Sequence, residues 1–86
     1  MLGSELTIVH KTERFSHRDA CEVSRLALRA GPARRVVIDL QHAGEAETSA
    51  FAQLVRLRRC LLRLGRDLSL CGLRDHAAGL YEVNRL

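Results

Sequence analysis

The stretch RRVVIDL, residues 34–40, decides the fold class of this 86-residue chain. Its apolar run of Val36, Val37 and Ile38 follows a break at a Gly-Pro pair and ends at an acid. A short continuous apolar run behind such a break is typical of a strand that is buried on both faces of a parallel sheet. We therefore expect the central strand of the fold over these residues.

Two further elements are expected before this strand. In residues 5–12, ELTIVHKT, successive side chains would point to opposite sides of an extended chain, with Leu6 and Ile8 on the same side. The stretch is also rich in β-branched side chains, which predicts a strand. Ser16 followed three residues later by Asp19 is a capping-box variant, and it predicts a helix over residues 17–30 that ends at the Gly-Pro pair. The apolar stripe expected on this helix comprises Ala20, Val23, Leu26, Ala27 and Ala30.

Three elements are expected after the central strand. Residues 48–64 carry the most regular helical spacing of apolar side chains in the chain, and Gly65 ends the pattern. Residues 67–73, DLSLCGL, predict a strand, and residues 74–86 predict a closing helix. The buried side of the central helix is expected to hold Ala50, Phe51, Leu54, Val55, Leu57, Leu61 and Leu64, and that of the closing helix Ala77, Leu80, Tyr81 and Val83.

The order of these elements predicts the architecture. Strands separated by helices of this length need crossover connections, which give a parallel or mixed sheet. The predicted fold class is α/β, with a small, mixed, largely parallel sheet and helices packed on it. A chain this short supports one hydrophobic core, so residues 1–86 are expected to form a single domain. The longest loop, residues 41–47, follows the carboxyl end of the central strand, where open α/β sheets bind ligands and partners.

Composition excludes several classes of protein. The chain is 47% hydrophobic and 28% charged, which is typical of a globular protein and not of a disordered one. No apolar run approaches the roughly 18–20 residues that span a bilayer, and the first residues lack the basic and apolar regions of a secretion signal. We expect a cytoplasmic protein with no membrane insertion.

Motifs of catalysis and cofactor binding are missing from the sequence. It contains no G-x-G-x-x-G, no phosphate-binding G-x-x-x-x-G-K-[ST] and no paired-carboxylate signature. Ser16, His17 and Asp19 resemble a catalytic set only in composition, because near neighbours in sequence cannot generally aim at one another. The histidines do not recur at the spacing of metal ligands on a helix. The sequence therefore predicts no enzyme, no metal and no cofactor.

The cysteines are predicted to be structural. Cys21, Cys60 and Cys71 are an odd number and have no C-x-x-C spacing. This pattern favours free thiols that are buried as small apolar side chains over a disulfide framework or a zinc site.

The charge of the chain is basic, with a formal net charge of +4 at pH 7. Four arginines recur at helical spacing and form a basic stripe along the central helix. The simpler explanation is a solvated helix face with cations near the helix C-terminus. The alternative is an electrostatic contact for an acidic partner or nucleic acid. With one Tyr, two Phe and no Trp, the chain has few side chains that could stack on single-stranded bases. Nucleic acid is therefore the less favoured partner. This basic stripe comprises Arg56, Arg59, Arg63 and Arg66.

The central part of the chain resembles the STAS family, named after sulfate transporters and anti-sigma-factor antagonists. The family's buried strand, which ends in an acid and a leucine, is similar to residues 36–40. Its loop leads without a gap to residues 47–50, ETSA, which stand in the place of an Asp-Ser-Ser-Gly or Asp-Thr-x-Gly motif. The apolar helix that follows, with its basic end and its glycine, resembles residues 51–65, and the next strand and turn resemble residues 68–74.

The chain also departs from the family pattern. Glu47 stands where the family has Asp, Ala50 where it has Gly, and Glu45 where it has an apolar residue. Arg14 and Phe15 replace a Gly-Glu-like turn, and the family's first and last strands have no counterpart. The resemblance therefore implies a divergent and minimal STAS-like domain.

The resemblance implies a non-enzymatic regulator of bacterial signal transduction. Antagonist-type members bind an anti-sigma kinase of the GHKL fold and leave it when the hydroxyl residue after the motif acid is phosphorylated, which is called partner switching. That position is Thr48, and Ser49 is its neighbour. The family leaves a second function open, a cytoplasmic subunit that binds the ATPase of a lipid-transporting ABC system and docks through the same threonine. An arginine-rich nucleic-acid-binding module is the third alternative.

The predicted partner surface has simpler explanations residue by residue. Thr48 or Ser49 could be the N-cap of the central helix, Asp39 could turn the loop after the central strand, and His42 could be an ordinary surface residue. The exposed edge of residues 5–12 leaves a homodimer open as well. The partner-binding residues expected from the resemblance are Asp39, His42, Glu47, Thr48, Ser49, Ala50, Gln53 and Arg56.

Overall fold

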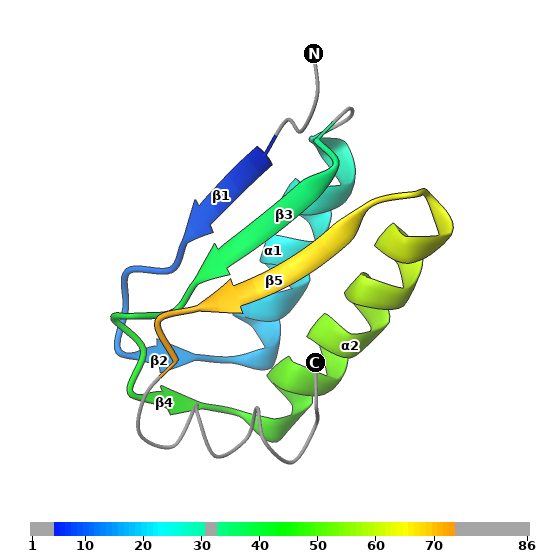
Figure 1. Cartoon of the computed structure of the whole chain (residues 1–86). Helices are drawn as coiled ribbons and strands as arrows, with labels where there is room; N and C mark the ends of the chain where they lie inside the picture. The colour runs from blue at the N-terminus through cyan, green and yellow to red at the C-terminus, as the bar shows by residue number, and fades with distance from the viewer. Residues whose placement is uncertain (1–4, 31–32, 74–86) are drawn as a thin grey trace.

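A computed structural model describes residues 5–30 and 33–73 (Figure 1). Three strands of five residues and two helices make the framework, and two strands of two residues each lie in the connections. In chain order the elements are β1 (Glu5–Val9), β2 (Arg14–Phe15), α1 (His17–Arg29), β3 (Arg35–Asp39), β4 (Glu45–Ala46), α2 (Thr48–Arg63) and β5 (Asp67–Cys71).

The main sheet has the strand order β1-β3-β5, and both of its strand pairs are parallel. Ile8, Ile38 and Leu70 lie side by side in its register. Each crossover moves one strand along in the same direction, and both helices lie against the same face of the sheet (Figure 1). The prediction of an α/β fold with a parallel sheet and β3 as its central strand is confirmed.

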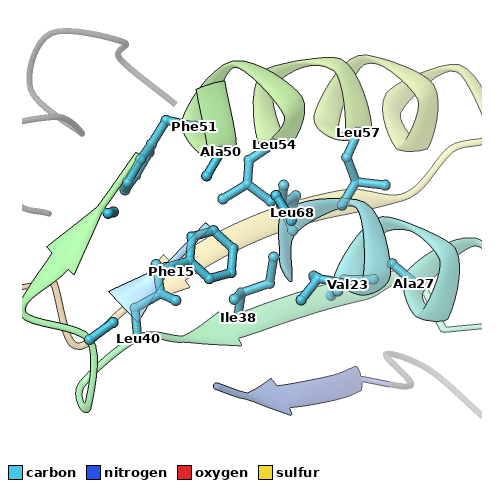
Figure 2. Packing of buried hydrophobic residues seen from close by; sticks show 14 of the residues in the cluster. Phe15, Val23, Ala27, Ile38, Leu40, Ala50, Phe51, Leu54, Leu57 and Leu68 are labelled. Atoms are coloured by element: carbon cyan, nitrogen blue, oxygen red, sulfur yellow. The ribbon is translucent and has the colours of Figure 1, made fainter. Parts of the chain in front are cut away.

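The core lies between this sheet face and the two helices (Figure 2). Val36 and Ile38 of β3 are fully buried, and so are Phe15 of β2 and Phe51 of α2. Burying side chains of this size contributes about 1.5–3 kcal/mol each before chain entropy is counted. The small side chains of α1, Ala20 and Ala27, let this helix approach α2 closely.

The prediction of burial is wrong for two residues of the apolar stripes. Leu26 is 47% exposed, because it lies about 100° around α1 from the buried Ala27. Leu64 is 63% exposed, because α2 ends at Arg63 and Leu64 already belongs to the turn. Gly65 adopts a φ of +73°, as expected of the residue that ends this helix.

The start of α1 is capped as its sequence predicts. The Ser16 hydroxyl accepts the Asp19 N–H at 3.2 Å, and the Asp19 carboxylate accepts the Ser16 N–H at 2.9 Å. Partial burial alone would raise the pKa of Asp19, but the hydrogen bonds from Ser16 and the positive charges of His10 and Arg18 lower it below its ordinary value. Ser16 and Asp19 are therefore structural residues of a helix cap.

Arg66 does not belong to a solvated stripe, contrary to one of the two predictions for it. It is 8% exposed, and its guanidinium donates to the carbonyl oxygens of Ala33 at 2.5 Å and Ala27 at 2.8 Å. These bonds satisfy a carbonyl near the end of α1 and tie that end to the strand that follows α2. The exposed stripe on α2 is therefore limited to Arg56, Arg59 and Arg63.

A second, two-stranded sheet was not predicted. Arg14 of β2 pairs with Glu45 of β4, and Phe15 with Ala46, in parallel. The loop expected over residues 41–47 therefore contains a strand. This small sheet lies beyond the carboxyl ends of β1, β3 and β5, next to the start of α2 (Figure 1).

The closing helix predicted for residues 74–86, with Ala77, Leu80, Tyr81 and Val83, lies outside the described residues. Within residues 5–30 and 33–73, neither helix has the length and apolar composition needed to cross a membrane.

Candidate functional site

The starts of both helices and the small sheet come together at one end of the molecule (Figure 1). An open hollow of about 540 Å³ is found there. It lies where parallel α/β sheets usually bind ligands and partners, beyond the carboxyl ends of their strands. The residues that line it are Arg14, Glu45, Ala46, Glu47 and Thr48.

Glu47 joins the two helix starts. It is the N-cap residue of α2, yet its side chain makes no capping bond to that helix. Its carboxylate reaches α1 instead, where Oε1 accepts the backbone N–H of His17 at 2.7 Å and Oε2 accepts from Arg14 Nη2 at 3.4 Å. The extra methylene of Glu relative to Asp provides this reach. Glu47 is therefore a link between helices as well as a residue of the hollow.

Thr48 and Ser49 are the first two residues of α2, and both are exposed. The interpretation of either one as the N-cap is wrong, because Glu47 occupies that position and its carbonyl oxygen accepts the Ala50 N–H at 3.0 Å. The first turn of α2 contains no acidic residue. No side chain within this first turn offsets the positive end of the helix dipole, and the nearest carboxylates are those of Glu45 and Glu47, which line the hollow.

Gln53 and Arg56 continue the exposed side of α2 away from Thr48. Gln53 is half-buried, and its amide donates to the Ser24 hydroxyl of α1 at 3.4 Å. The Ser24 hydroxyl in turn donates to the Ala20 carbonyl at 2.8 Å. Arg56 is exposed. Of the two, Arg56 offers its charge to solvent, and Gln53 holds the helices together.

Asp39 and His42 lie in the connection between β3 and β4. Asp39 Oδ1 accepts the Gln41 N–H at 2.9 Å, so the carboxylate turns the chain after β3. Gly72 approaches the same place with a φ of +71°, and a Cβ there would lie 2.8 Å from Asp39 Oδ1. His42 is exposed, with its Nε2 3.5 Å from the Gln41 amide nitrogen. Neither residue lines the hollow beside Thr48.

Ala50 cannot offer its side chain to a partner. It is fully buried and packs in the core beside Phe51 and Leu54 (Figure 2). The partner-contact prediction for Ala50 is corrected for this reason: the third position of α2 points toward the sheet.

The three cysteines are free, as predicted, but they are exposed instead of buried. Cys21 follows the buried Ala20, and Cys60 precedes the buried Leu61, so each lies on the outer side of its helix. Cys71 ends β5, and partial desolvation and the neighbouring Asp39 carboxylate raise the pKa of its exposed thiol. For Cys21 and Cys60, a place next to apolar residues in the sequence gave the wrong signal, because a shift of one residue turns a helix by about 100°.

Arg14, His17 and Glu45 also belong to this end of the molecule, and the sequence did not single them out as partner-site residues. The bonds from Arg14 and His17 to Glu47 cross 33 and 30 residues of chain. No local pattern reports contacts of this kind. Within the described ranges, no three His, Cys, Asp or Glu side chains gather as a metal site.

Comparison with protein-family models, with curated proteins and with solved structures gave no match to this chain. The resemblance to the STAS family therefore rests on the sequence of residues 36–74 alone.

Proposed function

We propose that this domain is a non-enzymatic, STAS-like regulator that binds an anti-sigma kinase of the GHKL type through the start of α2 and is released by phosphorylation of Thr48. The observation that supports this most is the exposure of Thr48 at the first position of a helix without an acidic first turn, at the rim of the hollow. The partner surface comprises Arg14, Glu45, Glu47, Thr48, Ser49 and Arg56.

A phosphate on Thr48 would be tolerated by the domain itself. It would lie at the positive end of the α2 dipole, and Arg14 lines the same hollow. Glu45 and Glu47 would repel it, but Glu47 already directs its carboxylate to His17 and Arg14. The modification therefore need not disturb the fold.

The same phosphate would disturb a partner that covers this surface. A contact that accommodates a neutral threonine would have to desolvate about 1.5–2 negative charges after modification. A difference of about 3 kcal/mol, which such desolvation readily supplies, weakens binding about a hundredfold. Phosphorylation would thus act on the complex far more than on the free domain.

Two alternatives to this proposal are a nucleic-acid-binding module and a subunit of an ABC system. Burial of Arg66 shortens the exposed basic stripe that a nucleic acid could contact to Arg56, Arg59 and Arg63. A subunit that clamps an ABC ATPase would use the same exposed threonine as a docking residue, and only the response to charge at Thr48 distinguishes it. That alternative predicts a constitutive complex.

The test is capture of proteins from the source cells by tagged wild type, Thr48→Glu and Thr7→Glu. Thr7 is an exposed threonine of β1, so Thr7→Glu places the same charge on a different surface. We expect wild type and Thr7→Glu to retain a kinase of the GHKL fold and Thr48→Glu to lose it. Mass spectrometry of the recovered wild type should locate phosphate on Thr48.

Three results would contradict the proposal: a kinase retained equally by Thr48→Glu, an ABC ATPase recovered in its place, or nucleic acid as the retained species. Circular dichroism of each variant controls for loss of the fold.

A further inference from the structure

Cys21 and His17 form a thiol–imidazole pair on the outer side of α1. Cys21 Sγ lies 3.5 Å from His17 Nε2, one helical turn apart. The other ring nitrogen, Nδ1, lies 3.3 Å from the backbone carbonyl oxygen of Ser49 at the start of α2. The imidazole is therefore held between a nucleophile and an orienting carbonyl.

The carbonyl fixes the role of each ring nitrogen. A carbonyl oxygen can only accept a hydrogen bond, so Nδ1 of His17 must carry the hydrogen in this contact. In the neutral ring Nε2 is then the acceptor, and it faces the Cys21 thiol. This is the arrangement in which an imidazole takes the proton of a thiol, with a third group that orients the base.

The surroundings of Cys21 are accessible and basic. The thiol is exposed, and Arg18 and Arg25 lie three residues before and four residues after it, which places them next to it on the helix surface. Glu22 pairs with Arg25 and offsets part of this charge. An anionic reagent can approach such a thiol, and cationic neighbours are typical of reactive cysteines.

We propose that Cys21 is a site of thiol–disulfide exchange with small anionic disulfides, of which oxidised glutathione is the example, and that His17 is its base. The imidazole Nε2 takes the thiol proton, and Cys21 Sγ attacks one sulfur of the disulfide. One S–S bond breaks and one forms, so that Cys21 is oxidised to a mixed disulfide. The leaving thiolate is the reduced half, and it takes the proton back from His17.

The chain contains its own controls for this chemistry. Cys60 is exposed too and has Arg56 and Arg63 as neighbours at similar helical spacings, but no imidazole contact to it is found in the part of the chain that the structure describes. Cys71 is exposed too, but it lies beside the Asp39 carboxylate, which opposes formation of a thiolate. The structure therefore orders the three thiols, with Cys21 the most reactive and Cys71 the least.

The test measures the rate at which each cysteine of the native protein forms a mixed disulfide with excess oxidised glutathione at one fixed pH, by peptide mass spectrometry. We expect Cys21 to react at least about tenfold faster than Cys60. In His17→Asn, whose amide can still donate to the Ser49 carbonyl but cannot act as a base, Cys21 should fall to the rate of Cys60. An unchanged Cys60 rate in that variant shows that the effect is confined to Cys21, and circular dichroism shows that the fold is intact.

A second reagent separates the base from the charges. Neutral iodoacetamide should give the same order of the three thiols and the same loss in His17→Asn. Equal rates at Cys21 and Cys60 in the wild type would overturn the proposal. A lead of Cys21 that occurs only with glutathione and survives His17→Asn would also overturn it, because the arginines and not His17 would then be its cause. Neither result depends on the partner of Thr48.

Discussion

The first residues of the two helices contact each other, through His17 with Glu47 and Ser49, but the two helix starts are capped differently. At α1, Ser16 and Asp19 satisfy the first turn from within the local sequence, and Glu47 adds a third acceptor from across the chain. At α2, Glu47 caps only with its backbone carbonyl, and Thr48 and Ser49 stand exposed. The Glu47 carboxylate is therefore bound to the start of α1, and the exposed Thr48 and Ser49 leave the start of α2 accessible to a partner.

The largest effect is expected from the residue that supports both helix starts. Phe15, the second residue of β2, is fully buried in the core directly before the Ser16 cap, so Phe15→Ala should lower the free energy of unfolding by about 3–5 kcal/mol. Urea unfolding followed by circular dichroism measures this loss. Leu64→Ala, at an exposed leucine, is the control and should stay within about 0.5 kcal/mol of wild type. Similar losses in both variants would mean that Phe15 does not anchor this end.

Removing the Glu47 carboxylate should destabilise the start of α1, which it contacts, and not that of α2, which it does not cap. Glu47→Ala leaves the His17 N–H without its acceptor, and we expect a loss of about 1 kcal/mol in unfolding free energy. Glu22→Ala removes a carboxylate of a surface ion pair on the same helix and should cost only a few tenths of a kcal/mol. A Glu47 variant as stable as the Glu22 variant would show that the link between the helices contributes nothing.

Adding an acid at the open helix start should stabilise the domain. Thr48→Asp supplies the negative charge that the first turn of α2 lacks, with an expected gain of about 0.3–1 kcal/mol near neutral pH. The melting temperature should rise by a few degrees, and high salt should reduce the gain. Thr7→Asp, on β1, should give no such rise. A lower melting temperature for Thr48→Asp than for Thr7→Asp would contradict an anion-accepting start of α2.

The smallest effect is the pH dependence of the α1 cap. The pKa of Asp19 is lowered in the folded protein, so the unfolded chain binds its proton more readily as the pH falls. The stabilisation is therefore complete above the ordinary value of 3.8 and is lost as the pH falls through the lower folded value. Wild type should lose more stability than Asp19→Asn over this acidic range. Parallel pH profiles of the two proteins would show that Asp19 does not contribute to the pH dependence of stability.

The same contrast explains what the sequence could predict. The strand at residues 35–39, the helix that starts after Ser16 and the buried face of α2 follow from spacing over a few residues, and each was found. The short β2–β4 sheet, the contact of Glu47 with His17 and the buried hydrogen bonds of Arg66 join residues about 30 or more positions apart. A local pattern cannot report them, because only the folded sheet brings these segments together.

The candidate site was predicted only in part, because it also joins segments that are distant in the sequence. Thr48 and Ser49 were singled out by their place in a resemblance, and their exposure agrees with the role proposed for them. Ala50 was placed on the same surface and is buried, because consecutive helical residues point in different directions. Arg14, which lines the hollow from a distant segment, had no signal in the sequence.

The most direct test of the central claim is the affinity of the captured kinase for purified wild type, Thr48→Glu and Thr7→Glu, measured by titration calorimetry. We predict that Thr48→Glu binds about a hundredfold more weakly than wild type, a change of about 3 kcal/mol, whereas Thr7→Glu binds as wild type does. Equal affinities for all three proteins would show that charge at the start of α2 does not control the partner.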